Sequence, residues 1–565
     1  MKKLITPILA ILIFTNFLSA QIINIPADYS TIQQGIDSAN VGDTILVAPG
    51  TYYENLDIST DDIVLASWIL TTNDTSYISQ TVIDGNNTAK VLLIHNSLFN
   101  NPVTINGFTI TNGLGYWGGG ISADHGHFHL LNSKVINNYS YTSGGGIDCF
   151  SSRFSIDNCV IADNETWGPG GGMHTSVYLS DNFIMNKKKN FELKGSHITN
   201  TIFRNNHAAS VGGAYHKEWL TSVHFVNCTF ENNSSEQYGG AIASQWEGAI
   251  SFNNVKIINN SSEGTGGGVA IEWAELEMNN VEVAYNTAKK GGGMAIYLTQ
   301  TYYDTSIYSN VSVHNNFAED TAGGLYLSEF KENFKNITVA DNDAAYARGI
   351  FIRKSNIYLE NSIIFGETYP QKIVFADYDD STTLTINNSL VQGGQYFINT
   401  NNNGTVNWLD GNINQNPVFV NSGDFPYQIN DNSPCIDAGS LDTTGITEFD
   451  LAGEPRFFNG RIDMGAYEWN TFVGINENKF ITENAVVYPN PFNKATSINY
   501  MLDKDQKVKI SIYKSDGKQV HHSILNQQSG EQKFIWDASS LPSGYYYYQI
   551  QMGDKIFSGK MIKVI

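Results

Sequence analysis

Apolar residues recur along the middle of the chain in a pattern centred on an asparagine. They occupy positions minus four, minus two, plus one and plus three, with polar residues between them, as in Phe154, Ile156, Cys159 and Ile161 around Asn158. Alternation on both sides of one residue predicts two short strands joined by a bend. A third apolar position follows a glycine-rich triplet in each repeat, so the pattern predicts about three short strands per unit.

Two asparagines six residues apart mark each repeat, and the glycine triplet follows about six residues later. The step between repeats is 25 to 27 residues, except for two longer intervals that begin at Asn158 and Asn280. A fixed step of this length indicates one unit repeated by stacking, and three strands per unit describe a coil of a parallel β-helix. The nine first asparagines are Asn106, Asn132, Asn158, Asn200, Asn227, Asn254, Asn280, Asn310 and Asn336, and the second are Asn112, Asn138, Asn164, Asn206, Asn233, Asn260, Asn286, Asn316 and Asn342.

Identical positions in stacked coils form columns, because neighbouring strands lie about 4.8 Å apart. We expect each asparagine column to be a ladder, since asparagine tolerates the left-handed turn and its amide can bond to the same amide one coil away. Glycines at the third bend permit positive φ and close backbone approach. The longest interval predicts an outward loop at residues 178–196, which contains Lys187, Lys188 and Lys189. Insertions on one face of a solenoid often mark its binding face.

A short helix pattern precedes the repeats. Ile32 and Ile36 fall on one face, and Ser30 with Gln33 predicts a capping box, before an expected strand at residues 44–48. A helix here would cover the open end of the solenoid. The stretch resembles the opening of right-handed parallel β-helix proteins of the pectate-lyase-like superfamily, and this resemblance implies the right-handed sense.

The repeats also resemble those of polymorphic outer-membrane proteins, in which phenylalanine and asparagine precede a GGA-I signature. The best matches are FRNNHAASVGGAY at 203–215 and FENNSSEQYGGAI at 230–242. The resemblance is to a repeat type, which is associated with adhesion.

The C-terminal stretch has short alternating strands that predict a small antiparallel β-sandwich. It resembles the C-terminal sorting domain of type IX secretion cargo, and the matching residues are Tyr488, Pro489, Asn490, Pro491, Phe492 and Gly544. The resemblance implies the type IX secretion machinery as a partner, transfer across the outer membrane, and surface attachment or release.

The predicted fold is therefore all-β: a right-handed parallel β-helix with a short N-terminal capping helix, followed by a small β-sandwich. The expected divisions are a signal peptide at 1–20, a cap and first coils at 21–99, the β-helix at 100–400, its closing segment at 401–469, a linker at 470–487 and the sorting domain at 488–565. We expect no membrane-spanning segment after signal cleavage.

Charge narrows the range of partners. The formal net charge is -22, and removal of residues 1–20 takes away two lysines and no acidic residue, which gives -24. We therefore do not expect nucleic acid as a partner, because its phosphates would be repelled by this negative charge. Calcium is a possible cofactor, with Asp437, Asp450, Asp463 and Glu468 as candidate ligands in the closing segment. The preferred interpretation of these four is that they cap turns by accepting backbone N–H groups.

Two columns could carry chemistry. Asp148, His174 and His216 stand four residues beyond the first glycine of successive triplets, and alternation points them outward, with Glu218 two residues further on. They could supply an acid and a base for attack on a glycan, although a solvated sheet face needs polar residues in any case. We prefer the structural interpretation.

The second column consists of Trp219, Trp246 and Trp273, at one offset in three consecutive coils, beside Glu218, Gln245 and Glu272. If exposed, it would be an aromatic strip for sugar rings, and if buried, an internal packing ladder. Offset counting leaves both open. The ordered aspartate, GHG and RIK motifs of polygalacturonases and the arginine motif of pectate lyases are missing. We therefore expect a surface or secreted protein that binds a polysaccharide or another cell surface, with a polysaccharide lyase or glycoside hydrolase acting on an acidic glycan as the alternative.

Overall fold

The computed structural model describes residues 20–95, 101–177, 196–297, 308–329, 331–366, 372–378, 381–457, 460–469, 485–488, 490, 492–502, 504–514, 518–553 and 555–563. The lysine-bearing loop, most of the expected signal peptide, and Pro489 and Pro491 of the sorting motif lie outside these ranges. The chain divides into two compact units, Met1–Asn470 and Thr471–Ile565.

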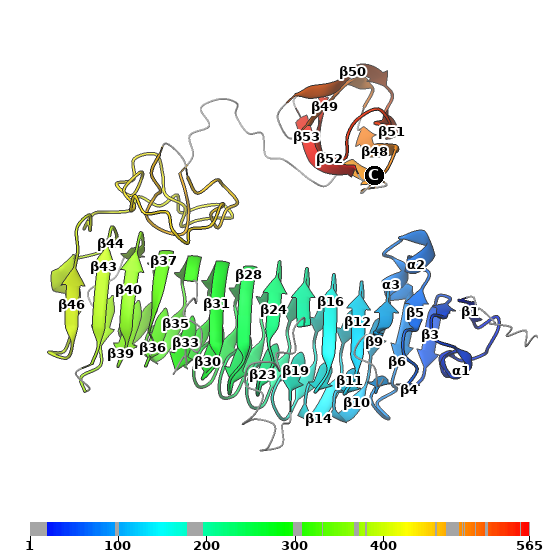
Figure 1. The fold of residues 1–565 in the computed structure, drawn as a ribbon, viewed down its shortest axis with the longest axis horizontal. Coiled ribbons are helices and arrows are strands. Elements are labelled where there is room, and N and C mark those ends of the chain that lie inside the picture. Colours follow the sequence, from blue (N-terminus) through cyan, green and yellow to red (C-terminus); the bar gives the residue numbers. More distant parts are fainter. Residues whose placement is uncertain are drawn as a thin grey trace, which may run out of the picture. The chain divides into compact units, whose positions relative to one another are not determined.

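The first unit is a parallel β-solenoid built from three sheets, two of which run its length (Figure 1). Sheet 2 has one strand from each of thirteen coils, and its described strands pair in parallel. Its strands are β4 (Leu56–Ile58), β7 (Leu92–Ile94), β11 (Ile121–Asp124), β15 (Ile147–Phe150), β19 (Met173–Ser176), β23 (Tyr215–Glu218), β27 (Ile242–Gln245), β30 (Val269–Glu272), β33 (Met294–Tyr297), β36 (Leu325–Ser328), β39 (Ile350–Arg353), β42 (Ile373–Phe375) and β45 (Ile398–Asn399).

Sheet 1 bends at the first asparagine of each repeat. It comprises β1 (Ile22–Ile25), β2 (Thr44–Val47), β3 (Gly50–Tyr53), β5 (Val64–Ser67), β6 (Thr81–Asp84), β8 (Val103–Asn106), β9 (Thr109–Thr111), β12 (His127–Leu131), β13 (Lys134–Ile136), β16 (Arg153–Asp157), β17 (Val160–Ala162), β20 (Ser196–Thr199), β21 (Ile202–Arg204), β24 (Val223–Val226), β25 (Thr229–Glu231), β28 (Ala249–Ile258), β31 (Glu275–Ala284), β34 (Tyr308–His314), β37 (Lys331–Ala340), β40 (Asn356–Glu360), β41 (Ile363–Phe365), β43 (Thr383–Asn387), β44 (Leu390–Val391) and β46 (Thr405–Trp408).

Sheet 3 is the shortest side of the coil and leads into the glycine triplet. Its strands are β10 (Leu114–Trp117), β14 (Tyr139–Ser143), β18 (Glu165–Thr166), β22 (His207–Ala208), β26 (Ser234–Ser235), β29 (Ser261–Ser262), β32 (Thr287–Lys290), β35 (Phe317–Thr321) and β38 (Asp343–Tyr346). The three sheets enclose one continuous apolar core that extends from Ile23 to Ile398. The alternating apolar positions of the sequence supply this core, as the repeat pattern predicts.

The two asparagine columns play different parts. The first occupies the left-handed turn, as at Asn158 and Asn227 with φ of 53° and 54°. The second is buried, and each Oδ1 accepts both the backbone N–H and the Nδ2 of the preceding asparagine, as Asn260 does from Asn233 at 2.9 and 3.0 Å. The Nδ2–Oδ1 bonds, of 2.9 to 3.0 Å, link the column from Asn138 to Asn342. The predicted ladder is therefore present.

The first pair of the predicted columns is out of register by one residue. Asn106 pairs with Leu131, so Gly107 occupies the position of Asn132, and Gly113 takes the ladder position opposite Asn138. The assignment of Asn112 to the second column was wrong, and Asn106 precedes the left-handed turn, although its Oδ1 still accepts from Asn132 Nδ2 at 2.9 Å. The turn at Gly107 has φ of 86°, so glycine there replaces the left-handed asparagine of later coils.

The N-terminal end is covered by α1 (Ile32–Ser38), which packs against β1, β2 and β4. Its N-cap is Thr31, whose Oγ1 accepts from the Gln34 N–H at 3.2 Å. The predicted Ser30 and Gln33 capping box was therefore wrong by one residue. Glu54 from the following coil accepts the Ile32 and Gln33 N–H groups at 2.9 and 3.0 Å, so tertiary contact completes the cap. The remaining short helices are α2 (Ile69–Thr72), α3 (Tyr77–Gln80) and the 3-10 turn η1 (Gln395–Phe397).

The closing segment runs back along the flank of the solenoid after β46. Arg456 Nε donates to Asn310 Oδ1 at 3.1 Å, and Asn336 Nδ2 donates to the Asp463 carbonyl at 3.2 Å. The Ser440 N–H donates to Asn361 Oδ1 at 2.6 Å. The segment therefore occupies the amide groups of Asn310 and Asn336 in the first asparagine column, and of Asn361 at the same position in the next coil.

The second unit has two antiparallel sheets around a shared core. One contains β47 (Ala485–Tyr488), β48 (Ala495–Leu502) and β51 (Gly530–Asp537), and the other β49 (Gln506–Lys514), β50 (Gln519–Gln527), β52 (Gly544–Met552) and β53 (Lys555–Lys563). Ile498 and Trp536 from the first sheet pack with Val508, Tyr546 and Ile550 from the second. This arrangement confirms the predicted antiparallel β fold. Within the described residues, no helix has the length and apolar character needed to cross a membrane.

Candidate functional site

The candidate residues lie on the outer face of sheet 2, at the second or last positions of β15, β19, β23, β27 and β30, or in the turns that follow them. Parallel register aligns Asp148 with His174, and His174 with His216. Two residues further along, it aligns Glu218 with Gln245, and Gln245 with Glu272. The predicted offsets therefore correspond to real columns, one coil apart.

The column of Asp148, His174 and His216 is buried, so the expectation of a solvated outer face was wrong. These side chains belong to residues that are 4%, 5% and 2% exposed. The glycine turn of the same coil covers them: a Cβ added at Gly144 would lie 2.8 Å from the Asp148 Cβ, and one at Gly170 would lie 2.8 Å from the His174 Cβ. Alternation places the column outside the solenoid core, but the returning backbone of sheet 3 shields it from solvent.

A chain of polar contacts connects this buried column to the surface. Ser143 Oγ donates to Asp148 Oδ1 at 2.7 Å, and His174 Nδ1 lies 2.7 Å from the same oxygen. His174 Nε2 is 3.5 Å from Glu218 Oε2, and the Glu218 side chain is 33% exposed. The contacts therefore place one imidazole between two carboxylates, one of which reaches solvent.

His216 continues the polar contacts toward the next coils. Its ring stacks on that of His174, with centroids 5.3 Å apart. Its Nε2 lies 3.3 Å from Gln245 Oε1, and Gln245 Nε2 donates to Glu272 Oε2 at 2.8 Å. The candidate residues of the two columns thus belong to one connected polar cluster.

The surroundings of the two histidines shift their pKa values in opposite directions. Burial lowers the pKa of His174, but the hydrogen bond to Asp148 and the nearby Glu218 carboxylate outweigh this effect and raise it to about 9. Burial and the neighbouring His174 charge lower the pKa of His216 to about 3. The contact with His174 also lowers the pKa of Glu218. At neutral pH the cluster therefore holds an imidazolium, a neutral imidazole and an ionised Glu218.

The three tryptophans form a surface ladder at the turn that follows these strands. All three have positive φ, at 45°, 60° and 55°, and Trp219 and Trp273 are 45% and 38% exposed, with Trp246 partly buried between them. The Trp219 and Trp246 rings stack at 5.4 Å with planes 13° apart, and Trp246 meets Trp273 at 4.4 Å and 75°. Of the two arrangements left open by the sequence, the structure has the exposed one.

Lys217 was missed by the sequence analysis. It takes an inward position of β23 and is fully buried, and its Nζ donates to the backbone carbonyls of Gln245 and Glu247. Burial lowers its pKa to about 7. These bonds fix the backbone on both sides of Trp246. The available signal was a lysine at a position that the strand alternation assigns to the core.

Three of the four carboxylates proposed as calcium ligands, those of Asp450, Asp463 and Glu468, accept backbone N–H groups. Asp463 accepts from Asp437 and Trp469, both at 2.6 Å, and Asp450 accepts from Glu468 at 2.6 Å. Glu468 also pairs with Arg456 at 3.1 Å. The capping interpretation accounts for these contacts, and the described residues contain no group of three or more His, Cys, Asp or Glu arranged to hold a metal ion.

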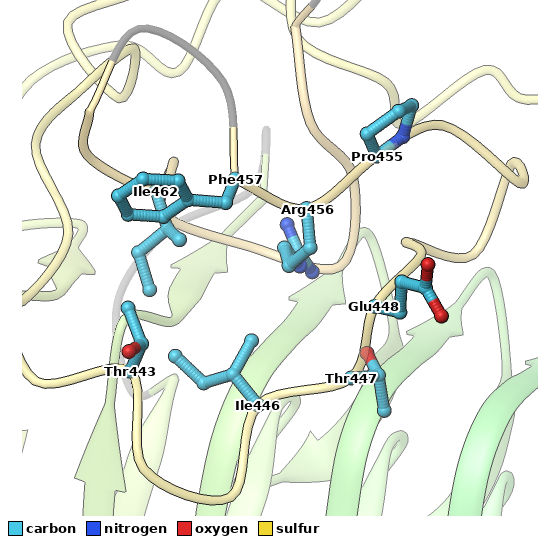
Figure 2. A pocket seen from close by; sticks show the side chains of 8 residues that line it. All are labelled: Thr443, Ile446, Thr447, Glu448, Pro455, Arg456, Phe457 and Ile462. Atoms are coloured by element: carbon cyan, nitrogen blue, oxygen red, sulfur yellow. The ribbon is translucent and has the colours of Figure 1, made fainter. Parts of the chain in front are cut away.

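A separate cavity of about 430 Å³ lies in the closing segment (Figure 2). Ile446, Phe457 and Ile462 supply much of its apolar lining, and Arg456 also borders it. The Arg456 guanidinium is directed to Asn310, Gly465 and Glu468, where it makes hydrogen bonds. The arginine therefore serves to dock the closing segment on the solenoid.

The sorting-motif residues occupy the second unit. Phe492 is buried in its core, Asn490 Nδ2 donates to the Lys560 carbonyl at 3.1 Å, and Gly544 begins β52 with φ of 148°. Tyr488 ends β47. The described residues of the motif thus help to join the start of the unit to its last strand.

Comparison with known families agrees with both parts of the structure. Residues 486–564 match the secretion system C-terminal sorting domain, and residues 227–245 match the Chlamydia polymorphic membrane protein repeat. No curated protein matched the chain. The fold and these matches define an exported parallel β-solenoid with a type IX sorting domain, which is directed to the cell surface or the surrounding medium.

Proposed function

We propose that this exported protein binds a polysaccharide along the tryptophan ladder of Trp219, Trp246 and Trp273. The observation that supports the proposal most strongly is the partial exposure of three aromatic side chains in consecutive coils. Large apolar rings on a solvated surface are costly unless a ligand covers them, and such surfaces often mark binding sites.

The spacing of the ladder suits an extended ligand. Successive coils lie about 4.8 Å apart, so a chain that runs along the solenoid axis meets each ring in turn. Trp219 stacks on Trp246 through one face, which leaves its opposite face uncovered by the other rings of the ladder. Gln245 and Glu272 stand beside the rings and offer hydrogen-bonding groups for sugar hydroxyls.

The second candidate is a polysaccharide lyase or glycoside hydrolase that uses Asp148, His174, His216 and Glu218. The contact between Glu218 and His174 favours it, because an ionised carboxylate held by an imidazolium at the surface could act as a base. The burial of the other three side chains counts against direct contact with substrate. We therefore rank binding above catalysis.

Affinity electrophoresis of the purified protein through gels that contain neutral, acidic or amino polysaccharides tests the proposal. We expect retardation by at least one polymer, and its loss in Trp246→Ala. Trp167→Ala is the matched control, because Trp167 is 68% exposed but lies outside the ladder. Retardation that persists in Trp246→Ala, or none on any gel, contradicts the proposed site. Release of new reducing ends that is lost in Glu218→Gln would instead favour the enzyme.

A further inference from the structure

Acidic side chains surround the tryptophan ladder. Glu218 and Glu272 directly precede Trp219 and Trp273, and Glu247 directly follows Trp246. Glu275 begins β31, two residues after Trp273. Glu218, Glu247 and Glu275 all lie close enough to Lys217 to favour its charged form. The ladder is thus bordered by carboxylates from three consecutive coils.

Among the described residues, the two cations beside the ladder, His174 and Lys217, offset only part of the negative charge of Glu218, Glu247, Glu272 and Glu275. Lys217 lies inside the solenoid, where its Nζ donates to the backbone carbonyls of Gln245 and Glu247, on either side of Trp246. His174 is also buried, and Asp148 and Glu218 already flank it. The positive charges are therefore enclosed, whereas Glu218 is one-third exposed. A ligand that approaches the rings meets a negative rim.

We propose that the ladder selects polysaccharides that carry free amino groups over neutral and acidic ones. This inference rests on the proposed function and specifies the ligand class for the same site. An ammonium group over an indole face gains cation–π attraction, and neighbouring carboxylates provide charge-assisted hydrogen bonds. An acidic polysaccharide would instead meet like charges.

Matched oligosaccharides isolate the effect of charge. A hexamer of β-1,4-linked glucosamine and its fully N-acetylated counterpart share one backbone, and a galacturonate hexamer supplies the opposite charge. Binding to the purified full-length protein is measured by calorimetry at low ionic strength and mildly acidic pH, where the amines are protonated. We expect the amino hexamer to bind at least roughly tenfold more tightly than the acetylated one. Salt at roughly 0.5 M should reduce this preference, because it screens exposed charges.

Two variants locate the charge effect. Glu247→Gln combined with Glu272→Gln should remove most of the preference while leaving the Glu218 contact with His174 unchanged. Glu165→Gln combined with Glu263→Gln removes the same number of charges at exposed positions away from the ladder and should leave the preference intact. A preference retained in the first variant, or lost equally in the second, overturns the inference.

The outcomes also separate this inference from the proposed function. Equal or tighter binding of the acetylated or galacturonate hexamer, lost in Trp246→Ala, overturns the charge selection and leaves glycan binding at the ladder standing. Binding of no hexamer at all contradicts both.

Discussion

Asn233 illustrates how one side chain joins three coils. Its Oδ1 accepts from the backbone N–H and Nδ2 of Asn206, and its Nδ2 donates to Asn260 and to the Phe203 carbonyl. Asn233→Ala leaves buried donors and acceptors unpaired, so we expect a loss of roughly 2–4 kcal/mol in local stability. Amide hydrogen exchange checks this, because a solenoid opens locally and need not unfold in two states.

The matched control for Asn233→Ala is Asn253→Ala, which removes an exposed amide from β28. Exchange should accelerate around residues 203–260 in the first variant and remain near the wild-type rate in the second. Similar exchange in both variants would show that the buried ladder contributes little.

His174 predicts a specific dependence of stability on pH. Its folded-state pKa of about 9 exceeds the ordinary value of 6.5, so its stabilising contribution is complete below pH 6.5 and is lost as the pH rises through 9. The thermal midpoint of the wild type should therefore exceed that of His174→Gln most below pH 6.5. The comparison between the two proteins is needed because Lys217, with its pKa lowered to about 7, titrates in the opposite sense over an overlapping range.

An exposed histidine provides the control for this measurement. His197→Gln should shift the midpoint little at any pH, since His197 lies on the solvent side of β20. A His174→Gln difference that stays constant or grows with pH would contradict the raised pKa.

The sequence predicted which residues share a column better than it predicted their surroundings. The offset from the glycine triplet correctly aligned Asp148, His174 and His216, because stacked coils repeat in register. It did not reveal their burial, since the path of the glycine turn over them depends on the fold of the whole coil. The exposure of the tryptophans could not be predicted either, because the left-handed residues at the turn interrupt the alternation of the strand.

At the scale of one coil, the glycine triplet controls how closely successive turns stack. A Cβ at Gly267 would lie 2.3 Å from the Gly292 carbonyl oxygen, whereas Gly268 occupies the position that alanine fills at Ala214 and Ala241. We expect Gly267→Ala to cost about 2–3 kcal/mol by forcing coils apart, and Gly268→Ala to cost about 1 kcal/mol or less. Comparing hydrogen exchange around residues 266–293 in the two variants measures the difference. Equal effects would show that the middle glycine has no special steric role.

The sequence pattern predicted that the helices and strands exist, but it did not predict the tertiary contacts that their residues make. The apolar face of Ile32 and Ile36 correctly indicated the capping helix, yet its cap depends on Glu54, which lies 21 and 22 residues from the amides it binds. Likewise, nothing local indicated that Arg456 would bond to Asn310. Both contacts arise from tertiary packing, which a local pattern does not contain.

At the scale of the whole molecule, the sorting domain and the tryptophan ladder belong to separate units. The sorting domain matches residues 486–564, and the ladder lies in the solenoid. Deleting residues 486–565 should therefore prevent delivery to the surface or medium while the solenoid still accumulates in the cell. Fractionation of a type IX-competent host with an antibody against the solenoid checks this. Normal export of the truncated chain would contradict a sorting role for this domain.

The solenoid architecture was predictable because its signal is repeated many times. One misplaced coil, the one with Asn106 and Asn112, did not disturb the overall assignment, since the other coils carry the same spacing. A binding site has no such redundancy. Lys217 and the acidic rim each occur once, so only the assembled structure indicates their relation to the ladder.

Hydrogen exchange of the protein, with and without the polysaccharide that retards it most, tests whether the tryptophan ladder is the glycan site. Binding along the ladder predicts protection confined to three turns, at residues 218–220, 245–248 and 272–275, with the rest of the solenoid unchanged. Protection at another surface, or binding without protection at these turns, would contradict the assignment of the tryptophan ladder as the glycan site.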